Sequence, residues 1–217
     1  MNIILARHGN TFHAHEPAYY VGSQHDLPLV PFGIEQAQAI GQALHHQGCH
    51  LAGVYTGPLK RVRSTAQTAL TAMQSPLQEV IDERLNELDY GLWSGLTSQE
   101  VRQRFGDAEY EAWERRSQWP SLGVWGETEE AVVARITAFA QDMAQRYAEQ
   151  DTVLVVASNG CLRYFLKLIP ALFEEYRSQR LLKIGTGHLC QLHYDHKHWT
   201  LDYWNQAPTS FMTDLVR

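Results

Sequence analysis

Hydrophobic positions along the chain follow two patterns: short continuous apolar runs, and longer stretches with helical spacing. Residues 3–6, 52–56 and 152–157 form short runs that are typical of buried strands. In the run at 152–157 successive side chains are apolar, so both faces of that strand are expected to be buried, as in a parallel sheet. The segments 188–194 and 199–204 are expected to form a closing hairpin.

Between these runs, apolar residues recur three or four positions apart, which is the spacing of an amphipathic helix. The spacing predicts helices from residue 34 to a stop at Gly48, and over 59–73, 127–149 and 160–168. Strands that alternate with helices predict an α/β fold, here a three-layer α/β/α sandwich around a largely parallel central sheet. In such sheets ligands bind beyond the carboxyl ends of the strands.

Composition narrows the class of protein. At 217 residues and 44% hydrophobic residues, the chain is expected to form one domain over residues 1–217 with an ample core. It has 18 Lys and Arg against 24 Asp and Glu, a net charge of −6, so neither nucleic acid nor a membrane is expected as a partner. A local arginine cluster can still bind a small anion. The sequence does not indicate an oligomeric state.

The cysteines favour a cytoplasmic location. There are 3 of them and no Cys-x-x-Cys pair, which suits a reducing compartment. The apolar run that ends before Arg7 is too short for a signal peptide or a membrane span.

Candidate chemistry begins at the end of the first predicted strand, with the segment Arg7-His8-Gly9-Asn10. Arginine offers a planar fork of donors for phosphate oxygens, and a neutral imidazole can attack phosphorus. Glycine lets the backbone approach a ligand closely, and Asn10 adds a further hydrogen bond. Taken alone, the segment is equally typical of a helix-entry turn with a structural histidine.

Two further clusters add a cation and a carboxylate. Arg61 falls in the first turn of a predicted helix, where free N–H groups and the helix dipole favour an anion, whereas Lys60 and Arg63 face elsewhere. Glu87 lies in an apolar, aromatic and glycine-rich loop, where desolvation strengthens proton binding and suits a general acid. Asp89 is the fallback, with a surface turn residue as its plainer interpretation.

In this order, these clusters resemble the histidine phosphatase superfamily, also called phosphoglycerate mutase-like. The resemblance covers residues 2 to about 205 and rests on Arg7-His8-Gly9, Pro58-Leu59-x-Arg61 with Thr65-Ala66, Leu85-x-Glu87-x-x-x-Gly91-x-Trp93-x-Gly95, and Gly126-Glu127-Thr128. Each piece alone is unspecific, but their combination is specific.

The resemblance implies phosphoryl transfer through a phosphohistidine. His8 would attack a small phosphomonoester in line, while Arg7 and Arg61 would hold the phosphate oxygens. Glu87 would protonate the leaving alcohol and then activate water. Neither a metal nor another cofactor is expected, because the arginines supply the positive charge.

The last family motif departs from the pattern. Ser158 stands where the family usually has a second histidine, so Ser158 and Asn159 are expected to hydrogen-bond the phosphate without its charge. A lost charge-assisted bond is worth about 1.5–3 kcal/mol. His188, after a glycine-rich approach, is a candidate to compensate. Ala14 replaces an Asn that many family members carry, and His13 or His15 could take over its contact.

Several alternatives stay open. The leading interpretation is a metal-independent phosphatase; a phosphoglycerate mutase-type transferase and a catalytically weak phospho-ligand binding or regulatory protein are its rivals. The pairs His13/His15 and His196/His198 have spacing that suits metal ligands, but nothing nearby completes a site. A loop at 105–126 is expected to set the substrate. It carries tryptophans that could form a lid or pack the core: Trp113, Trp119 and Trp125.

Overall fold

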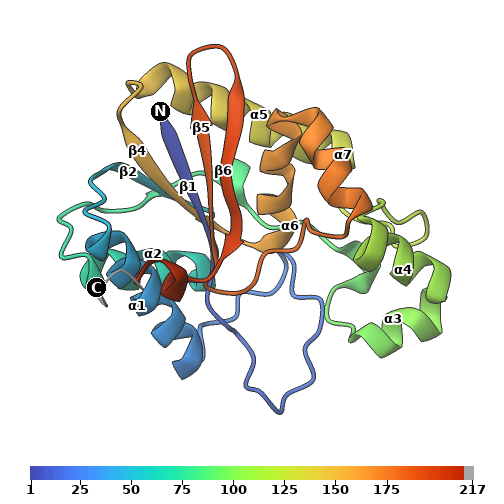
Figure 1. Ribbon diagram of the computed structural model, residues 1–217. Helices are drawn as coiled ribbons and strands as arrows, with labels where there is room; N and C mark the ends of the chain where they lie inside the picture. The colour runs from blue at the N-terminus through green and yellow to red at the C-terminus, as the bar shows by residue number, and fades with distance from the viewer. Residues whose placement is uncertain (213–217) are drawn as a thin grey trace.

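The computed structural model describes residues 1–212; the last five positions of the expected 1–217 domain lie outside the described residues. Six strands form one sheet in the order β3-β2-β4-β1-β5-β6 (Figure 1). Their bounds are Asn2–Arg7 (β1), Leu51–Thr56 (β2), Val80–Ile81 (β3), Thr152–Ala157 (β4), Leu189–Tyr194 (β5) and Trp199–Gln206 (β6). The first four run parallel to their neighbours, and the β5–β6 hairpin closes one edge antiparallel to β1.

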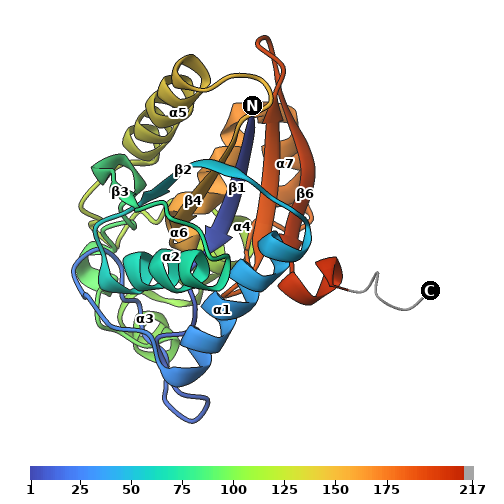
Figure 2. The same cartoon turned by 90° about the vertical axis from the view of Figure 1, so that its left-hand side faces the viewer.

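Helices cover both faces of this sheet (Figure 2). The helices are α1 (Pro31–His46), α2 (Lys60–Ala72), α3 (Ser98–Phe105), α4 (Asp107–Arg116), α5 (Glu129–Arg146), α6 (Asn159–Leu162) and α7 (Pro170–Ser178). Residues 1–212 also contain four 3-10 turns: η1 (Glu83–Leu85), η2 (Gly91–Trp93), η3 (Arg163–Leu168) and η4 (Pro208–Phe211). The predicted α/β/α sandwich with a mostly parallel sheet is confirmed.

Strand β1 shows how one short apolar run builds two cores. Ile3 and Leu5 pack into a cluster with residues of α5 and η3, whereas Ile4 and Ala6 pack into a second cluster with residues of α1 and α2. Because successive side chains of a strand point to opposite faces, this continuous run anchors helices on both sides of the sheet. Its carboxyl end is thereby held rigidly between the layers.

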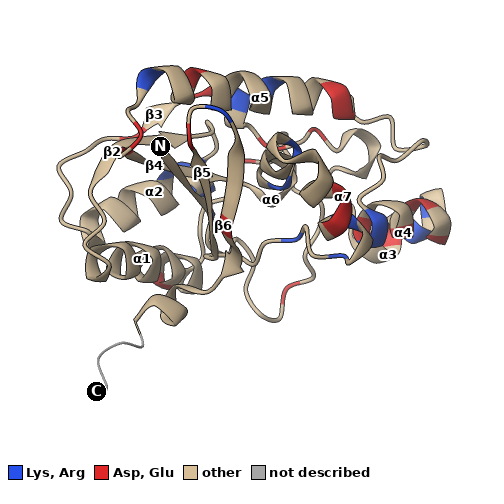
Figure 3. Cartoon of the chain, turned by 45° about the horizontal axis from the view of Figure 1, so that its top comes forward, with Lys and Arg blue, Asp and Glu red and all other residues tan. Residues whose placement is uncertain are grey.

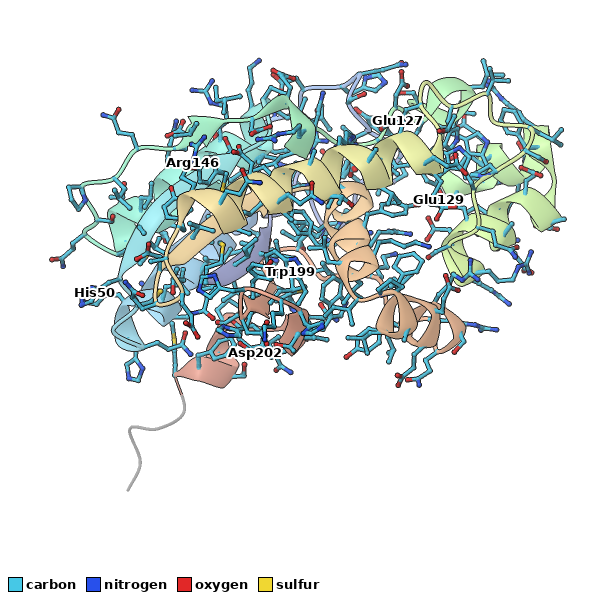
Figure 4. The ribbon with its side chains drawn as sticks, turned by 90° about the horizontal axis from the view of Figure 1, so that it is seen from above. His50, Glu127, Glu129, Arg146, Trp199 and Asp202 are labelled. Atoms are coloured by element: carbon cyan, nitrogen blue, oxygen red, sulfur yellow. The ribbon has the colours of Figure 1, made fainter. Side chains whose placement is uncertain are left out.

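Helix α5 crosses one face of the sheet and is seen from above in Figure 4, with Glu127 just before its start and Arg146 at its end. Thr128 caps it by accepting a hydrogen bond from the Ala131 N–H at 3.2 Å. Blue and red positions both mark the ribbon of α5 in Figure 3, whereas α1 is almost entirely uncharged. The buried stripe of α5 comprises Val132, Ile136, Phe139, Ala140 and Met143.

The sequence prediction missed three helices, α3, α4 and α7. The expected loop at 105–126 contains α4, and α3 precedes it; each helix buries one residue, Val101 in α3 and Trp113 in α4, so no apolar periodicity revealed them. A capping box of Thr97 and Glu100 starts α3. The predicted helical segment 160–168 is present as the short α6 followed by the 3-10 turn η3, whereas α7, which begins at Pro170, was not predicted.

Candidate active site

A cavity of about 410 Å³ opens at the carboxyl ends of β1 and β4. Its walls come from the segment after β1, the first turn of α2, the loop before η2, α4, and the α6–η3 junction. In Figure 1 the segment after β1, drawn in blue, runs below the sheet between α1 and the α3–α4 pair. Six of the predicted site residues line this cavity: Arg7, His8, Asn10, Arg61, Glu87 and Asn159.

The His8 imidazole is fixed in a defined state. Its Nδ1 lies 2.7 Å from the Gly9 carbonyl oxygen, which makes Nδ1 the protonated nitrogen and leaves the Nε2 lone pair free. Burial, and then the charges of Arg61 and Arg7, lower the pKa of His8 well below 6.5, so the ring is neutral at pH 7. Neutral imidazole with a free Nε2 is the nucleophilic form.

Gly9 has a steric role that keeps the His8 backbone in place. A Cβ on Gly9 would lie 2.1 Å from the Gly33 carbonyl oxygen, so only glycine permits this approach to α1. The Gly9 N–H donates to Thr65 Oγ1 at 3.1 Å, and that hydroxyl in turn donates to the Arg61 carbonyl at 2.7 Å. The backbone beside His8 is thus tied directly to α2.

Two guanidinium groups supply positive charge beside His8. Arg7 donates through Nη1 to the Ile184 carbonyl, and burial lowers its pKa to about 10, so it stays charged at pH 7. Arg61 is buried and donates to the carbonyls of His25 at 2.9 Å and Gly22 at 2.8 Å. Their shared position on the cavity wall suits the binding of phosphate oxygens.

The basic neighbours of Arg61 point elsewhere, as helical geometry predicted. Lys60 pairs with Asp26 at 3.6 Å and Arg63 with Glu79 at 3.3 Å. Neither Lys60 nor Arg63 lines the cavity. Of these three basic residues at the start of α2, Arg61 alone therefore contributes its positive charge to the cavity.

Backbone donors orient the Glu87 carboxylate. Its Oε1 accepts hydrogen bonds from the N–H groups of Leu88 at 2.8 Å and Cys161 at 3.0 Å, and its Oε2 from Gly160 at 3.2 Å. A Cβ on Gly160 would lie 2.3 Å from Oε1, so glycine is required beneath the carboxylate. Asp89 does not line the cavity; its Oδ1 accepts from the Gly91 N–H at 2.9 Å, as expected of a turn residue.

The two amides of the site are held by neighbours at the cavity wall. Asn10 Oδ1 accepts from the Thr186 hydroxyl, while the Asn10 N–H donates to Gln36 Oε1 at 2.8 Å. Asn159 Oδ1 accepts from the Ile184 N–H at 2.8 Å. Their Nδ2 donors are left for a ligand.

Ser158 and His188 are the two predicted residues that do not line the cavity. Ser158 is buried, and its Oγ makes no hydrogen bond within residues 1–212. His188 pairs with β1 through its backbone, since its carbonyl accepts from the Arg7 N–H at 3.1 Å. Its Nδ1, however, contacts Asn205 Oδ1 at 2.9 Å, so the ring is engaged with β6 and does not reach the cavity wall.

The sequence analysis missed several residues that line the cavity, above all Arg163 and Tyr90. Arg163 stands in the last family motif, which was the available signal, and Tyr90 follows the Glu87 segment. Trp113 also lines the cavity and is 1% exposed. Trp119 and Trp125 pack at its back, with ring centroids 4.7 Å apart, so the tryptophans mainly form a packed aromatic cluster.

Metal ligands and membrane segments were also sought in residues 1–212. No group of three or more His, Cys, Asp or Glu side chains there could hold a metal ion. His13 lines the cavity beside Ala14, while His196 faces Glu149 at 3.6 Å. No helix in this part of the chain is long and apolar enough to cross a membrane.

Comparison with known proteins defines the class. The model of the histidine phosphatase superfamily, branch 1, matches residues 3–207, and the chain belongs to this family. A 2,3-bisphosphoglycerate-dependent phosphoglycerate mutase from Methylorubrum populi is 31% identical over 187 residues, which is 85% of each chain.

Solved structures show the same architecture. The alpha-ribazole phosphatase from Shigella flexneri is 27% identical, with a TM-score of 0.72 over 95% of this chain and 97% of that one. A mycobacterial glucosyl-3-phosphoglycerate phosphatase shares the fold, with a TM-score of 0.79, 23% identity and coverage of 94% and 98%.

Proposed function

We propose that the protein is a metal-independent phosphatase that hydrolyses a small phosphomonoester through a phosphohistidine on His8. The observation that carries this proposal is the state of the His8 ring. Its Nδ1 is held by the Gly9 carbonyl, burial beside two arginines keeps it neutral, and it lines a cavity with a carboxylate, Glu87. A free Nε2, flanking cations and a proton donor are the groups that phosphoryl transfer needs.

The first step forms the phosphoenzyme. Nε2 of His8 attacks phosphorus in line, the bond from phosphorus to the ester oxygen breaks, and Glu87 gives its proton to the leaving oxygen. Arg7, Arg61 and the amides of Asn10 and Asn159 hold the remaining oxygens. Although Ser158 does not line the cavity wall itself, its buried hydroxyl lacks a protein partner in the described chain and turns to the bound phosphate to donate one neutral hydrogen bond. The products are the free alcohol and phosphohistidine.

The second step returns the enzyme to its starting state. Glu87, now a carboxylate, accepts a proton from water as the water oxygen attacks phosphorus. The bond between phosphorus and Nε2 breaks, inorganic phosphate forms, and His8 is again neutral. Positive charge from arginine replaces the role that a metal ion fills in other phosphatases.

A mutase is the second candidate, because the 31% identical relative carries that name. Chain length does not separate the two activities: the match covers 85% of both chains, so that relative is about as long as this protein. The activities differ in the second step, where a mutase keeps the phosphoryl group from water and returns it to an alcohol. Hydrolysis is favoured because exposed residues such as Lys183 line the cavity, so water can reach the phosphoenzyme.

The test is a parallel assay of both activities on the same preparation. We expect phosphate release from phenyl phosphate and from alkyl phosphates, without any requirement for a bisphosphate. Phosphate transfer to 3-phosphoglycerate that exceeds phosphate release would assign a mutase instead. Tight binding of phosphate esters with neither activity would assign a phospho-ligand binding protein. The three free thiols, Cys49, Cys161 and Cys190, suit a cytoplasmic location for this enzyme.

A further inference from the structure

Arg163 is a third arginine in the wall of the same cavity, and the proposed reaction does not use it. It lies at the start of η3 and is 7% exposed. Within residues 1–212 it has no carboxylate partner, in contrast to Arg84 and Arg135, which both form ion pairs. A buried cation without a counter-ion is costly unless a ligand supplies the negative charge.

The guanidinium of Arg163 is held in place by neutral groups. It lies over the Trp113 ring, 4.3 Å from the centroid. Its Nη1 donates to Ser117 Oγ at 3.2 Å, and its Nε to the Asn159 carbonyl at 3.4 Å. Stacking and two neutral hydrogen bonds fix the direction of the fork without neutralising its charge.

Arg163 is separated from the point of phosphoryl transfer. The charges that act on His8 are those of Arg61 and Arg7. The Arg163 guanidinium instead stacks on Trp113 and donates to Ser117, so it lies against the C-terminal end of α4. A phosphate on His8 is therefore served by the first two arginines, and Arg163 faces the part of the cavity that holds the rest of the substrate.

Tyr90 provides a neutral donor in that same part of the cavity. Its hydroxyl makes no hydrogen bond in the described chain, although its side chain is 8% exposed and lines the cavity. Burial raises the pKa of Tyr90 well above 10, so the hydroxyl keeps its proton. The Tyr90 and Trp113 ring centroids are 6.3 Å apart, which brings this hydroxyl-bearing ring beside the one on which Arg163 stacks.

Besides Glu87, the acidic residues that line the cavity are Glu16 and Glu114, and both are already engaged. Glu16 accepts a hydrogen bond from the His13 N–H at 3.0 Å. Glu114 accepts a hydrogen bond from the Tyr20 hydroxyl at 2.7 Å and pairs with Lys183 at 3.7 Å. With Glu87 protonated for the first step, the buried charges of Arg7, Arg61 and Arg163 exceed those of a phosphate dianion by one. The cavity therefore has room for one more negative charge.

We propose that Arg163, together with the Tyr90 hydroxyl, recognises a second anionic group on the substrate, a carboxylate or a second phosphate, remote from the phosphate that is cleaved. This inference rests on the proposed phosphatase function and deepens it by naming the substrate class. A carboxylate and a phosphate both offer the oxygens that a guanidinium fork binds, and substrates that carry one or the other distinguish between them. The aromatic wall formed by Trp113 and Tyr90 packs against the carbon skeleton between the two groups.

The test uses alkyl phosphates of increasing chain length in matched sets. Each set has the same chain and ends in a carboxylate, a phosphate or a neutral carboxamide, so the leaving alcohol stays comparable. At the best chain length, we expect kcat/KM for an anionic member to exceed that of its carboxamide by about 10–100-fold. Whichever of the carboxylate and phosphate substrates has the higher kcat/KM identifies the second anionic group.

Variants assign this preference to Arg163. In Arg163→Gln we expect the ratio of anionic to carboxamide substrate to fall to within about threefold, whatever happens to the overall rate. The matched control is Lys183→Gln, which removes a cation at the exposed rim of the cavity and should retain most of the preference. The ratio is measured within one protein, so partial loss of folded enzyme does not affect it.

The outcomes separate the two proposals. Wild-type enzyme that hydrolyses the carboxamides as well as the anionic substrates at every length overturns the second-anion proposal and leaves the phosphatase proposal standing. The same holds if the preference survives in Arg163→Gln or is lost equally in Lys183→Gln. Absence of hydrolysis of every member, phenyl phosphate included, overturns both.

Discussion

The ends of two neighbouring parallel strands form the floor of the cavity, and they are chemically unequal. Strand β1 ends in Arg7 and continues into His8, both on the cavity wall. Strand β4 continues into Ser158, whose hydroxyl is buried and unbonded in the described chain, and then Asn159. The His8 N–H donates to the Ala157 carbonyl at 3.2 Å, so the two ends are physically joined.

The two strand ends therefore have different parts in the proposed reaction. The β1 end carries the proposed nucleophile His8 and the cation of Arg7, whereas the β4 end carries neutral donors and, in the first turn of α6, the backbone N–H groups that orient Glu87. We expect the neutral donors at the β4 end to contribute to phosphate binding only, while bond formation and proton transfer depend on His8 and Glu87. The β1 end is therefore expected to dominate the rate.

The largest effect is expected from His8→Ala. Removing the nucleophile should lower kcat for phenyl phosphate by about 10⁴-fold or more. His188→Ala is the matched control, because this second histidine lies beside β1 with its ring turned to Asn205; it should change kcat/KM by less than about threefold. Equal losses of activity in His8→Ala and His188→Ala would show that His8 has no special part in the reaction.

Glu87→Gln should come next. The variant keeps an oxygen for the α6 N–H groups but cannot carry the transferred proton, so kcat for an alkyl phosphate should fall by about 10²–10⁴-fold. Formation of the phosphoenzyme from an aryl phosphate should suffer less, because a phenolate leaves with less need of a proton. If alkyl and aryl substrates lose the same factor, Glu87 is not the general acid.

Arg61→Gln tests the cation that α2 brings to the β1 end. Loss of a buried donor to the transferred group should lower kcat/KM by about 10²–10³-fold. Arg63→Gln removes a cation from the same helix turn that pairs with Glu79 instead, and we expect it to be nearly neutral. Steady-state kcat/KM values for the two variants check this difference. Similar losses of kcat/KM in both would mean that total positive charge matters and the position of Arg61 does not.

The neutral state of His8 also has a consequence for stability. Its pKa is near 6.5 in an unfolded chain and well below this in the folded protein, so below pH 6.5 the unfolded chain binds the extra proton. Stability is then lost as the pH falls, by about 1.4 kcal/mol per unit, and His8 has no such effect above that range.

Urea unfolding of wild type and His8→Gln between pH 7 and pH 5 measures this contribution. The free energy of unfolding should fall more steeply in the wild type, and the two curves should run parallel near neutral pH. Parallel curves down to pH 5 would show that His8 is not held neutral by its surroundings.

The smallest effect is expected at the β4 end, from Ser158→Ala. A neutral hydrogen bond to a phosphate oxygen contributes about 0.5–1.5 kcal/mol, so kcat/KM should fall about 2–10-fold. Cys49→Ala, a substitution outside the cavity lining, is a control for differences between protein preparations. An unchanged kcat/KM would remove Ser158 from the site and leave the binding of phosphate at this strand end to Asn159.

Site residues could be predicted from the sequence where they lie directly at the end of a strand or at the start of a helix. The apolar runs ended directly before Arg7 and Ser158, and the helical spacing placed Arg61 in a first turn, so the strand ends and the α2 terminus were predictable. Helices α3 and α4 were not, because each buries one side chain and is otherwise polar.

The site residues that the sequence did not predict correctly depend on contacts between distant parts of the chain. Arg163 lies at the start of η3, and its place in the cavity depends on stacking over Trp113 of α4, a contact between residues 50 positions apart that no local pattern indicates. His188 was expected to help because its backbone neighbours β1. The side-chain direction, set by Asn205 on β6, could be known only from the folded hairpin.

Rapid-quench trapping of the phosphoenzyme shows directly whether His8 is the residue that is phosphorylated. Wild-type protein is mixed with an aryl phosphate, quenched in alkali within the first turnovers, digested and analysed by mass spectrometry. We predict one phosphoryl group on the peptide that contains His8, stable in alkali and lost in acid. Sustained hydrolysis with no phosphorylated His8 peptide at any time, and with full activity in His8→Ala, would contradict the account.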